Sequence, residues 1–125
     1  MRLTRKDFVK APCISNTGEQ VFEMIGAPIE LGKALYHSFG HVVIPKNCSS
    51  RKHSHPIAEE TYYILKGLAQ MVVDDKDYHL TPGDAILIQQ NEKHQIFCEG
   101  DCDLEFIVVC APAWTPDNSI YYDEE

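Results

Sequence analysis

Short apolar runs separated by turn-forming residues are the feature that most constrains the fold of this chain. The runs cover residues 21–25, 33–44, 61–65, 68–74, 77–80, 85–89, 94–98 and 104–110. Between two of them stands Thr81-Pro82-Gly83-Asp84, where proline presets φ and glycine supplies an angle that other residues avoid. The chain has no repeat and no long helical periodicity. Many short strands punctuated at intervals of about ten residues predict an all-β sandwich or barrel.

One stretch, His53-Ser54-His55-Pro56-Ile57-Ala58-Glu59-Glu60, places two histidines and two carboxylates ahead of the expected strand 61–65. Side chains on an extended segment alternate between faces, so His53 and His55 point the same way. Imidazoles paired in this manner can hold one divalent cation, and a carboxylate a few residues on can close a further position. The competing interpretation is that both are ordinary surface histidines on a basic loop that begins at Arg51. The stretch is therefore a candidate metal site.

The spacing His53-x-His55-x4-Glu60-x6-Gly67 resembles the first conserved motif of the cupins, Gly-x5-His-x-His-x3/4-Glu-x6-Gly. The second cupin motif, Gly-x5-Pro-x-Gly-x2-His-x3-Asn, falls on Gly83, Gln89, Asn91, His94 and Cys98. Asn47 and Asn91 stand where these motifs carry glycine, and asparagine is the non-glycine residue that best tolerates positive φ. Gln89 and Cys98 depart from the motif without such an explanation. The resemblance covers residues 33–111.

This resemblance implies an all-β, single-domain cupin, a double-stranded β-helix or jelly-roll barrel, over residues 19–111. Residues 1–18 would form an N-terminal arm, and residues 112–125 a tail that packs across a barrel face or a partner. It also implies that one divalent transition metal (iron, manganese, nickel, copper or zinc) is held by His53, His55, Glu60 and His94. Glu60 is the expected carboxylate because only it leaves six residues before Gly67, although a one-residue slip would exchange it with Glu59.

Two further residues are candidates for catalytic or substrate-orienting roles. Tyr62 shares the face of Glu60 if strand 61–65 pairs regularly, and the alternative is a core aromatic residue. In the run 33–44, His41 shares a face with His37, and either would relay protons only if that face lined the cavity. Cys98 lies on the face of His94, where a small core hydrophobe is the more common outcome.

Composition limits the partners and the compartment. The 125 residues, 44% of them hydrophobic and 24% charged, suit one soluble domain. A net charge of −8 disfavours nucleic acids and anionic membranes as partners. No run approaches the ~20 apolar residues of a membrane helix, and the first residues lack a signal-peptide pattern. Five irregularly spaced cysteines fit a reducing compartment, so we expect a cytoplasmic protein.

The leading interpretation is a metal-dependent cupin that acts on a small polar organic molecule, with dioxygenase-like or isomerase-like chemistry. The alternative is a non-catalytic module that binds a metal or a sugar-like ligand as a sensor or accessory protein. A metal-free sugar-nucleotide isomerase or epimerase is disfavoured, because such enzymes are not expected to keep all four ligands in register. The resemblance also implies a homodimer in which an N-terminal strand, residues 21–25, lies across the partner's sheet.

Overall fold

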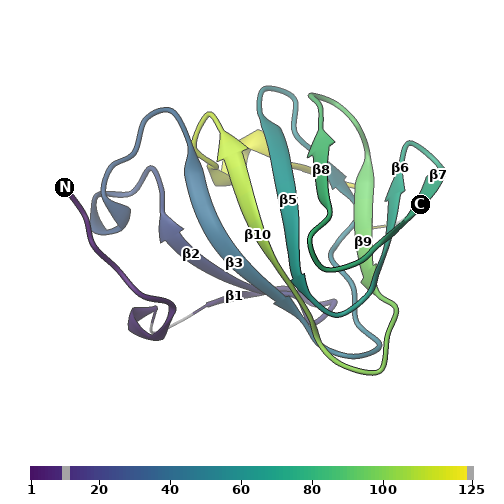
Figure 1. The fold of residues 1–125 in the computed structure, drawn as a ribbon. Helices are drawn as coiled ribbons and strands as arrows, with labels where there is room; N and C mark the ends of the chain where they lie inside the picture. Colours follow the sequence, from purple (N-terminus) through teal and green to yellow (C-terminus); the bar gives the residue numbers. More distant parts are fainter. Residues whose placement is uncertain (10–11, 124–125) are drawn as a thin grey trace.

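Two facing antiparallel sheets form the body of the protein (Figure 1). The computed structural model describes residues 1–9 and 12–123, and nearly all regular structure in these ranges is β. In spatial order the strands of one sheet are β1-β2-β3-β10-β5-β8, and those of the other are β11-β4-β9-β6-β7. This arrangement confirms the predicted all-β, double-stranded β-helix fold.

The strands of the described part are β1 Cys13–Ile14, β2 Gln20–Ile25, β3 Ser38–Ile44, β4 His53–Ser54, β5 Glu59–Lys66, β6 Ala69–Val73, β7 Lys76–Leu80, β8 Ala85–Ile88, β9 His94–Cys98, β10 Leu104–Ala111 and β11 Ile120–Tyr121. Short 3-10 helices lie at η1 Lys6–Phe8, η2 Ile29–Leu31 and η3 Pro116–Asn118. No helix of the described residues is long and apolar enough to cross a membrane.

Side chains alternate along the strands between the interior of the barrel and its surface. On β3 every second residue, from Ser38 to Ile44, is buried, while the residues between them are partly exposed. Ile44 pairs with Leu104 at one end of β3, and Ser38 pairs with Cys110 at the other. The almost fully buried apolar side chains of the core include Ile44, Ile64, Met71, Ile96, Leu104 and Phe106. Cys110 also pairs with Glu60, so polar groups enter the interior at the Ser38 end.

The two asparagines at cupin glycine positions adopt the conformation predicted for them. Asn47 has a φ of 66° and Asn91 a φ of 67°, so both turns keep the left-handed geometry without glycine. Asp74 and Asp75 also have positive φ, 47° and 68°, and join β6 to β7 in a two-residue hairpin turn. At Gly67 a Cβ would lie 2.7 Å from the Asp103 carbonyl oxygen, so this position requires glycine.

The run 33–44 was predicted as one strand, but β3 begins only at Ser38. Lys33 has a φ of 53°, and residues 33–37 are irregular, with a bend at residues 35–36. The inward face of β3 carries Val42 and Ile44, because burying these aliphatic side chains builds the core. His41 therefore lies on the outer face, where its Nε2 is 2.9 Å from Glu105 Oε1. The face of β3 that carries His41 does not line the cavity, so His41 is not placed to relay protons there.

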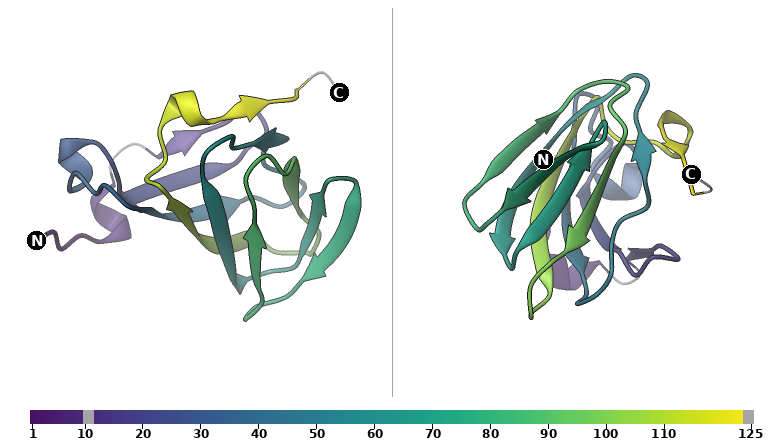
Figure 2. Two further views of the ribbon diagram at one scale, coloured as in Figure 1. Left: turned by 90° about the horizontal axis from the view of Figure 1, so that it is seen from above. Right: turned by 90° about the vertical axis from the view of Figure 1, so that its right-hand side faces the viewer.

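The strands β1, β2 and β11, near the two ends of the described chain, pair with strands of the barrel. β1 pairs with β2 and β2 with β3, so residues 21–25 pair within the sheet of their own chain. The C-terminal segment, yellow in Figure 2, runs beside β4, with which β11 pairs. Its Trp114 backbone N–H donates to Ser38 Oγ at 3.0 Å. The tail thus covers a face of the barrel at the polar end of β3.

Candidate metal centre

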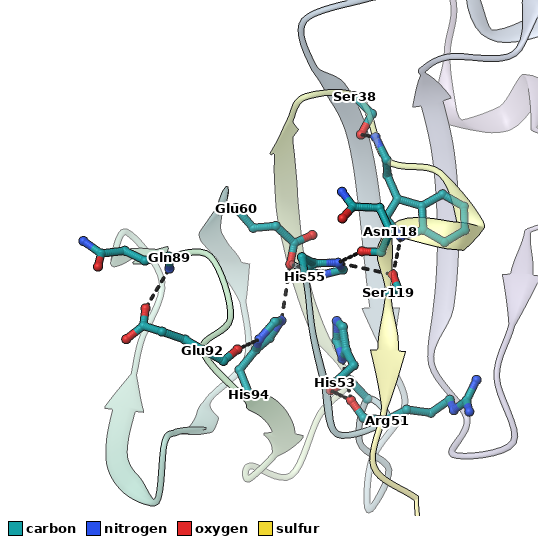
Figure 3. Close-up of polar contacts among 12 residues, drawn as sticks. Ser38, Arg51, His53, His55, Glu60, Gln89, Glu92, His94, Asn118 and Ser119 are labelled. Carbon is teal, nitrogen blue, oxygen red and sulfur yellow. Dashed lines mark hydrogen bonds and ion pairs between the residues drawn. The ribbon is translucent and has the colours of Figure 1, made fainter. Parts of the chain in front are cut away.

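Four side chains from both sheets converge inside the barrel (Figure 3). His53 on β4 and His94 on β9 are directly paired across their sheet. His55 follows β4, and Glu60 is the second residue of β5 in the facing sheet. One ligand atom from each of these four residues lies within 4.8 Å of the others. The fold thus brings together the four residues that the sequence predicts as metal ligands.

All three histidines turn the same ring nitrogen, Nε2, towards the centre. The other nitrogen, Nδ1, lies 2.7, 2.9 and 2.9 Å from a backbone carbonyl oxygen in His53, His55 and His94, where the acceptors are Arg51, Asn118 and Glu92 respectively. A carbonyl oxygen only accepts, so each Nδ1 carries the hydrogen, and Nε2 of each neutral ring bears a lone pair. This is the second-layer hydrogen bonding by which proteins orient metal-binding imidazoles.

Glu60 brings a negative charge to the point where these lone pairs meet. Its Oε1 lies 2.9 Å from His55 Nε2 and 3.3 Å from His94 Nε2. A carboxylate oxygen and two lone pairs at such distances repel one another unless positive charge lies among them. Apart from one another, these three buried atoms have no hydrogen-bond partner among the described residues. A divalent cation would satisfy all three, so the residues fit a metal ion.

Protons are the alternative source of positive charge at this centre. Burial raises the pKa of Glu60, but hydrogen bonds from His55 and His94 outweigh burial and lower the pKa to about 2. Burial lowers the pKa of His55, yet the hydrogen bond and charge of Glu60 reverse the effect and raise it. Burial and then repulsion from His94 lower the pKa of His53 to about 3. Metal binding therefore competes with protonation of His55.

The structure also shows where the other residues considered from the sequence lie, namely Glu59, Tyr62 and Cys98. Glu60 is 5% exposed whereas Glu59 is exposed, so the register is the predicted one. Tyr62 shares the face of Glu60 and stacks on Phe106 with ring centroids 4.6 Å apart, so it is both a core aromatic residue and part of the cavity wall. Burial raises its pKa well above the ordinary value. Cys98 packs against the core and does not line the cavity.

A cavity of about 770 Å³ opens onto the cluster. Of the metal-ligand candidates, His53, His55 and Glu60 form part of its wall. Much of the remaining wall is apolar and includes Val21, Leu31, Val42, Tyr62, Phe106, Val108 and Trp114. This volume suits an organic ligand of several carbon atoms held against a metal ion.

Two carboxyls, Glu19 and Glu23, also line this wall, although the sequence did not identify them as site residues. Together with Val21 they share one face of β2 and its N-terminal extension, as period two requires. That parity is visible in the sequence, but only the fold shows that this face points into the cavity. Burial and then repulsion from Glu60 raise the pKa of each carboxyl to about 7, and for Glu19 the charge of Arg51 acts in the opposite direction.

The C-terminal segment supplies further groups that the sequence did not reveal. Ser119 Oγ lies 3.2 Å from His55 Nδ1 and accepts a hydrogen bond from Trp114 Nε1 at 3.0 Å. The Asn118 side chain accepts a hydrogen bond from the Ile57 backbone N–H at 3.2 Å. These contacts join segments about 60 residues apart, and no local pattern in the sequence marks them.

The fold and the cluster define a class of protein: a double-stranded β-helix barrel with a candidate metal site of three histidines and one glutamate. A family model described as a cupin domain matches residues 40–110, more than half of the chain. The chain belongs to the cupin family.

Known proteins of similar sequence cover most of the chain. An uncharacterized protein of Methanocaldococcus jannaschii is 25% identical over 120 residues, which are 95% of this chain and 94% of that protein. An oxalate-binding protein of Thermotoga maritima is 31% identical over 103 residues, which are 74% of this chain and 85% of that protein.

Solved structures share the fold. The polyketide cyclase RemF from Streptomyces resistomycificus has a TM-score of 0.77 at 23% identity, over 99% of this chain and 88% of that chain. An oxalate decarboxylase from Lactobacillus farciminis has a TM-score of 0.76 at 23% identity, over 88% of this chain. The chain spans only 32% of that decarboxylase. At these identities the likeness shows the fold alone.

Proposed function

We propose that the protein is a metal-dependent cupin that acts on a small polar organic molecule, with dioxygenase-like or isomerase-like chemistry. The observation that carries this proposal is that three of the four clustered residues, His53, His55 and Glu60, line a cavity of about 770 Å³. Structural metal sites are closed by protein ligands, whereas catalytic sites keep a position open to water or substrate.

The residues of this chain would bind the metal ion and orient the organic ligand. The four ligands hold one divalent ion, and the backbone carbonyls bonded to Nδ1 keep the imidazoles in the binding orientation. When bound, such an ion supplies Lewis-acid stabilisation of an oxyanion or activates dioxygen. Tyr62 lies two residues from Glu60 on the cavity wall and would orient the organic ligand. The apolar wall excludes water from the ligand.

Metal content tests the proposal most directly. Protein purified without chelator or polyhistidine tag should contain about one transition-metal ion per chain, and His53→Ala and His94→Ala should lose it. His79→Ala is the matched control, because this histidine is exposed and bonded to Glu99, away from the cluster. An absence of stoichiometric metal after anaerobic reconstitution would overturn the proposal.

The bound ion then selects the assay. Ligand-dependent oxygen consumption by an iron-loaded protein supports dioxygenase-like chemistry. Deuterium exchange from solvent into a hydroxycarbonyl compound, without oxygen consumption, supports isomerase-like chemistry. Screening both readouts with the loaded protein and with His53→Ala shows which reaction depends on the cluster.

A second candidate function is ligand binding without turnover. It is favoured by one observation: the relative from Thermotoga maritima, 31% identical, is named an oxalate-binding protein. In that case the metal-loaded protein would bind a chelating anion and release it unchanged. Calorimetric binding of oxalate, with quantitative recovery of oxalate after prolonged incubation, would support this candidate over an enzyme.

We also propose that the protein forms a homodimer, through the outer face of the sheet that contains β5 and β8. Tyr63, Leu65 and Leu87 on these strands are 44%, 41% and 52% exposed, and apolar clusters of this kind mark protein contacts. Sedimentation should give the mass of two chains at micromolar concentration, and Leu87→Lys should give one chain with its metal retained. A monomeric wild type would refute the dimer.

A further inference from the structure

The cavity has a second polar region besides the metal cluster. Glu19 and Glu23 line it from the β2 side, whereas Glu60 lines it from β5. Strands β3 and β10 lie between β2 and β5 in the sheet. At the usual strand spacing, β2 and β5 are about 14 Å apart along the sheet, and less across its curved interior. A ligand that touches both regions is therefore longer than a two-carbon acid.

The residue paired with Glu23 across the sheet is a glycine, Gly40. Glu23 pairs with Gly40 on β3, where a Cβ would lie 3.3 Å from a Val108 methyl group and 3.9 Å from Glu23 Oε2. Because Gly40 has no side chain, a Val108 methyl group and the Glu23 carboxylate can both lie close over this position of β3. Glu23 and Val108 both form part of the cavity wall.

Neither carboxyl of the pair is satisfied by protein. Among the residues that the structure describes, no hydrogen bond or ion pair reaches the side-chain carboxyl of Glu19 or of Glu23, and only burial and the charges of other residues influence their pKa values. Solvent reaches part of each side chain through the cavity, but the surrounding protein removes enough water to raise both pKa values to about 7. Polar groups in such a place are costly unless a ligand bonds to them.

The charge of the cavity wall restricts the ligand further. Glu19, Glu23, Glu30 and Glu60 line the cavity, and Arg51 is the one Arg or Lys among the described lining residues. The Arg51 guanidinium is itself bonded to Asp123 and lies 3.5 Å from the Tyr121 ring centroid. Even with a divalent ion on the cluster, the β2 side of the cavity therefore repels anions.

We propose that Glu19 and Glu23 form a second recognition site, and that the cavity takes an uncharged, hydroxyl-bearing organic molecule. One end of this molecule chelates the metal through oxygen atoms, and a hydroxyl at its other end bonds to the two carboxyls. At neutral pH such carboxyls exist in both protonation states, so they both donate to and accept from a hydroxyl. This inference rests on the proposed function and names its ligand class, which excludes compact dianions.

Calorimetry on zinc-reconstituted protein under nitrogen tests the inference with three chelating probes. They are oxalate, catechol, and hydroxytyrosol, which is a catechol with a hydroxyethyl arm. Wild-type protein should bind hydroxytyrosol more tightly than catechol, because the added hydroxyl reaches towards the β2 carboxyls. In Glu19→Gln/Glu23→Gln, oxalate should bind about tenfold more tightly, since the negative charge carried by the two carboxyls is gone. In Glu19→Leu/Glu23→Leu, the preference for hydroxytyrosol over catechol should disappear.

The control is Asp77→Asn/Asp101→Asn, which replaces two carboxyls by amides at exposed positions and should leave all three affinities unchanged. Zinc content and circular dichroism establish that each variant is folded and loaded, and the single variant Glu23→Gln replaces any double variant that fails to fold. A wild type that does not retain zinc overturns the proposed function. A loaded wild type that binds catechol as tightly as hydroxytyrosol overturns the second recognition site alone, as does unchanged oxalate affinity in the glutamine variant.

Discussion

The His55 imidazole donates a hydrogen bond from Nδ1 to the backbone carbonyl oxygen of Asn118 at 2.9 Å, across 63 residues of sequence (Figure 3). A metal-ligand candidate inside the barrel is thereby oriented by the C-terminal segment. Ser119 Oγ approaches the same nitrogen at 3.2 Å. Hydrogen bonds of this kind fix which ring nitrogen faces the metal and raise its basicity.

Asn118→Ala should weaken metal binding. The Asn118 side chain anchors its turn to the Ile57 backbone N–H at 3.2 Å, so its loss frees the carbonyl that orients His55. We expect the metal Kd to rise about tenfold, which is the usual effect of disturbing a ligand's hydrogen-bond partner. Competition with a chromogenic chelator measures this change. Asp117→Asn, exposed in the same turn, is the control, and equal affinities in both variants would show that the tail does not position His55.

Glu60→Ala should abolish metal binding, whereas Glu59→Ala should leave it intact. Glu60 is buried at the cluster, and Glu59 is exposed. In the metal-free variant the pKa of His55 should also fall, because Glu60 is what raises it against burial. NMR titration of the histidine ring protons measures this shift independently of any metal. Loss of metal from the Glu59 variant alone would mean that the strand register is shifted by one residue.

Glu19→Gln/Glu23→Gln should alter the pH dependence of stability in metal-free protein. The pKa of each carboxyl is about 7 when folded, against an ordinary 4.5, so between these values the folded state binds more protons than the unfolded state. Stability contributed by the protonated carboxyls is therefore complete below about pH 4.5 and is lost as pH rises through about 7. Allowing for solvent access, the variant should gain about 1–3 kcal/mol on the wild type between about pH 5 and pH 8.

Urea unfolding at several pH values measures that gain. The difference between variant and wild type is the informative quantity, because all other titratable groups are the same in both proteins. A difference that does not change with pH would show that the two carboxyls have ordinary pKa values when folded.

Tyr62→Phe and His41→Ala should separate the two residues that the sequence singled out for chemistry. Tyr62→Phe keeps the stack on Phe106, so the free energy of unfolding should change by less than about 1 kcal/mol while ligand affinity falls. His41→Ala removes an outer-face contact with Glu105 and should change neither metal content nor ligand binding. Calorimetry with hydroxytyrosol compares the two, and weaker binding in the His41 variant would restore that residue as a candidate.

The sequence by itself determined the class of fold and pointed to the four residues that cluster at the candidate site. Period-two alternation and turn residues are local properties, and strand β9, predicted as 94–98, has those bounds in the structure. The spacing from His53 to Gly67 is local too, and it selected Glu60 over Glu59. The positive φ of Asn47 and of Asn91 could be predicted, because backbone sterics depend on the residue itself and little on its surroundings.

Only the tertiary structure decided which face of a strand points inward when both faces carry apolar residues. In β3, Phe39 and Val43 compete with Val42 and Ile44, and only packing against the facing sheet places His41 outside. For the same reason the sequence did not point to Glu19 and Glu23. Which face of β2 turns inward is set only by its pairing with β3. The bond between His55 and Asn118 depends on where a distant segment docks, and no local residue pattern encodes that position.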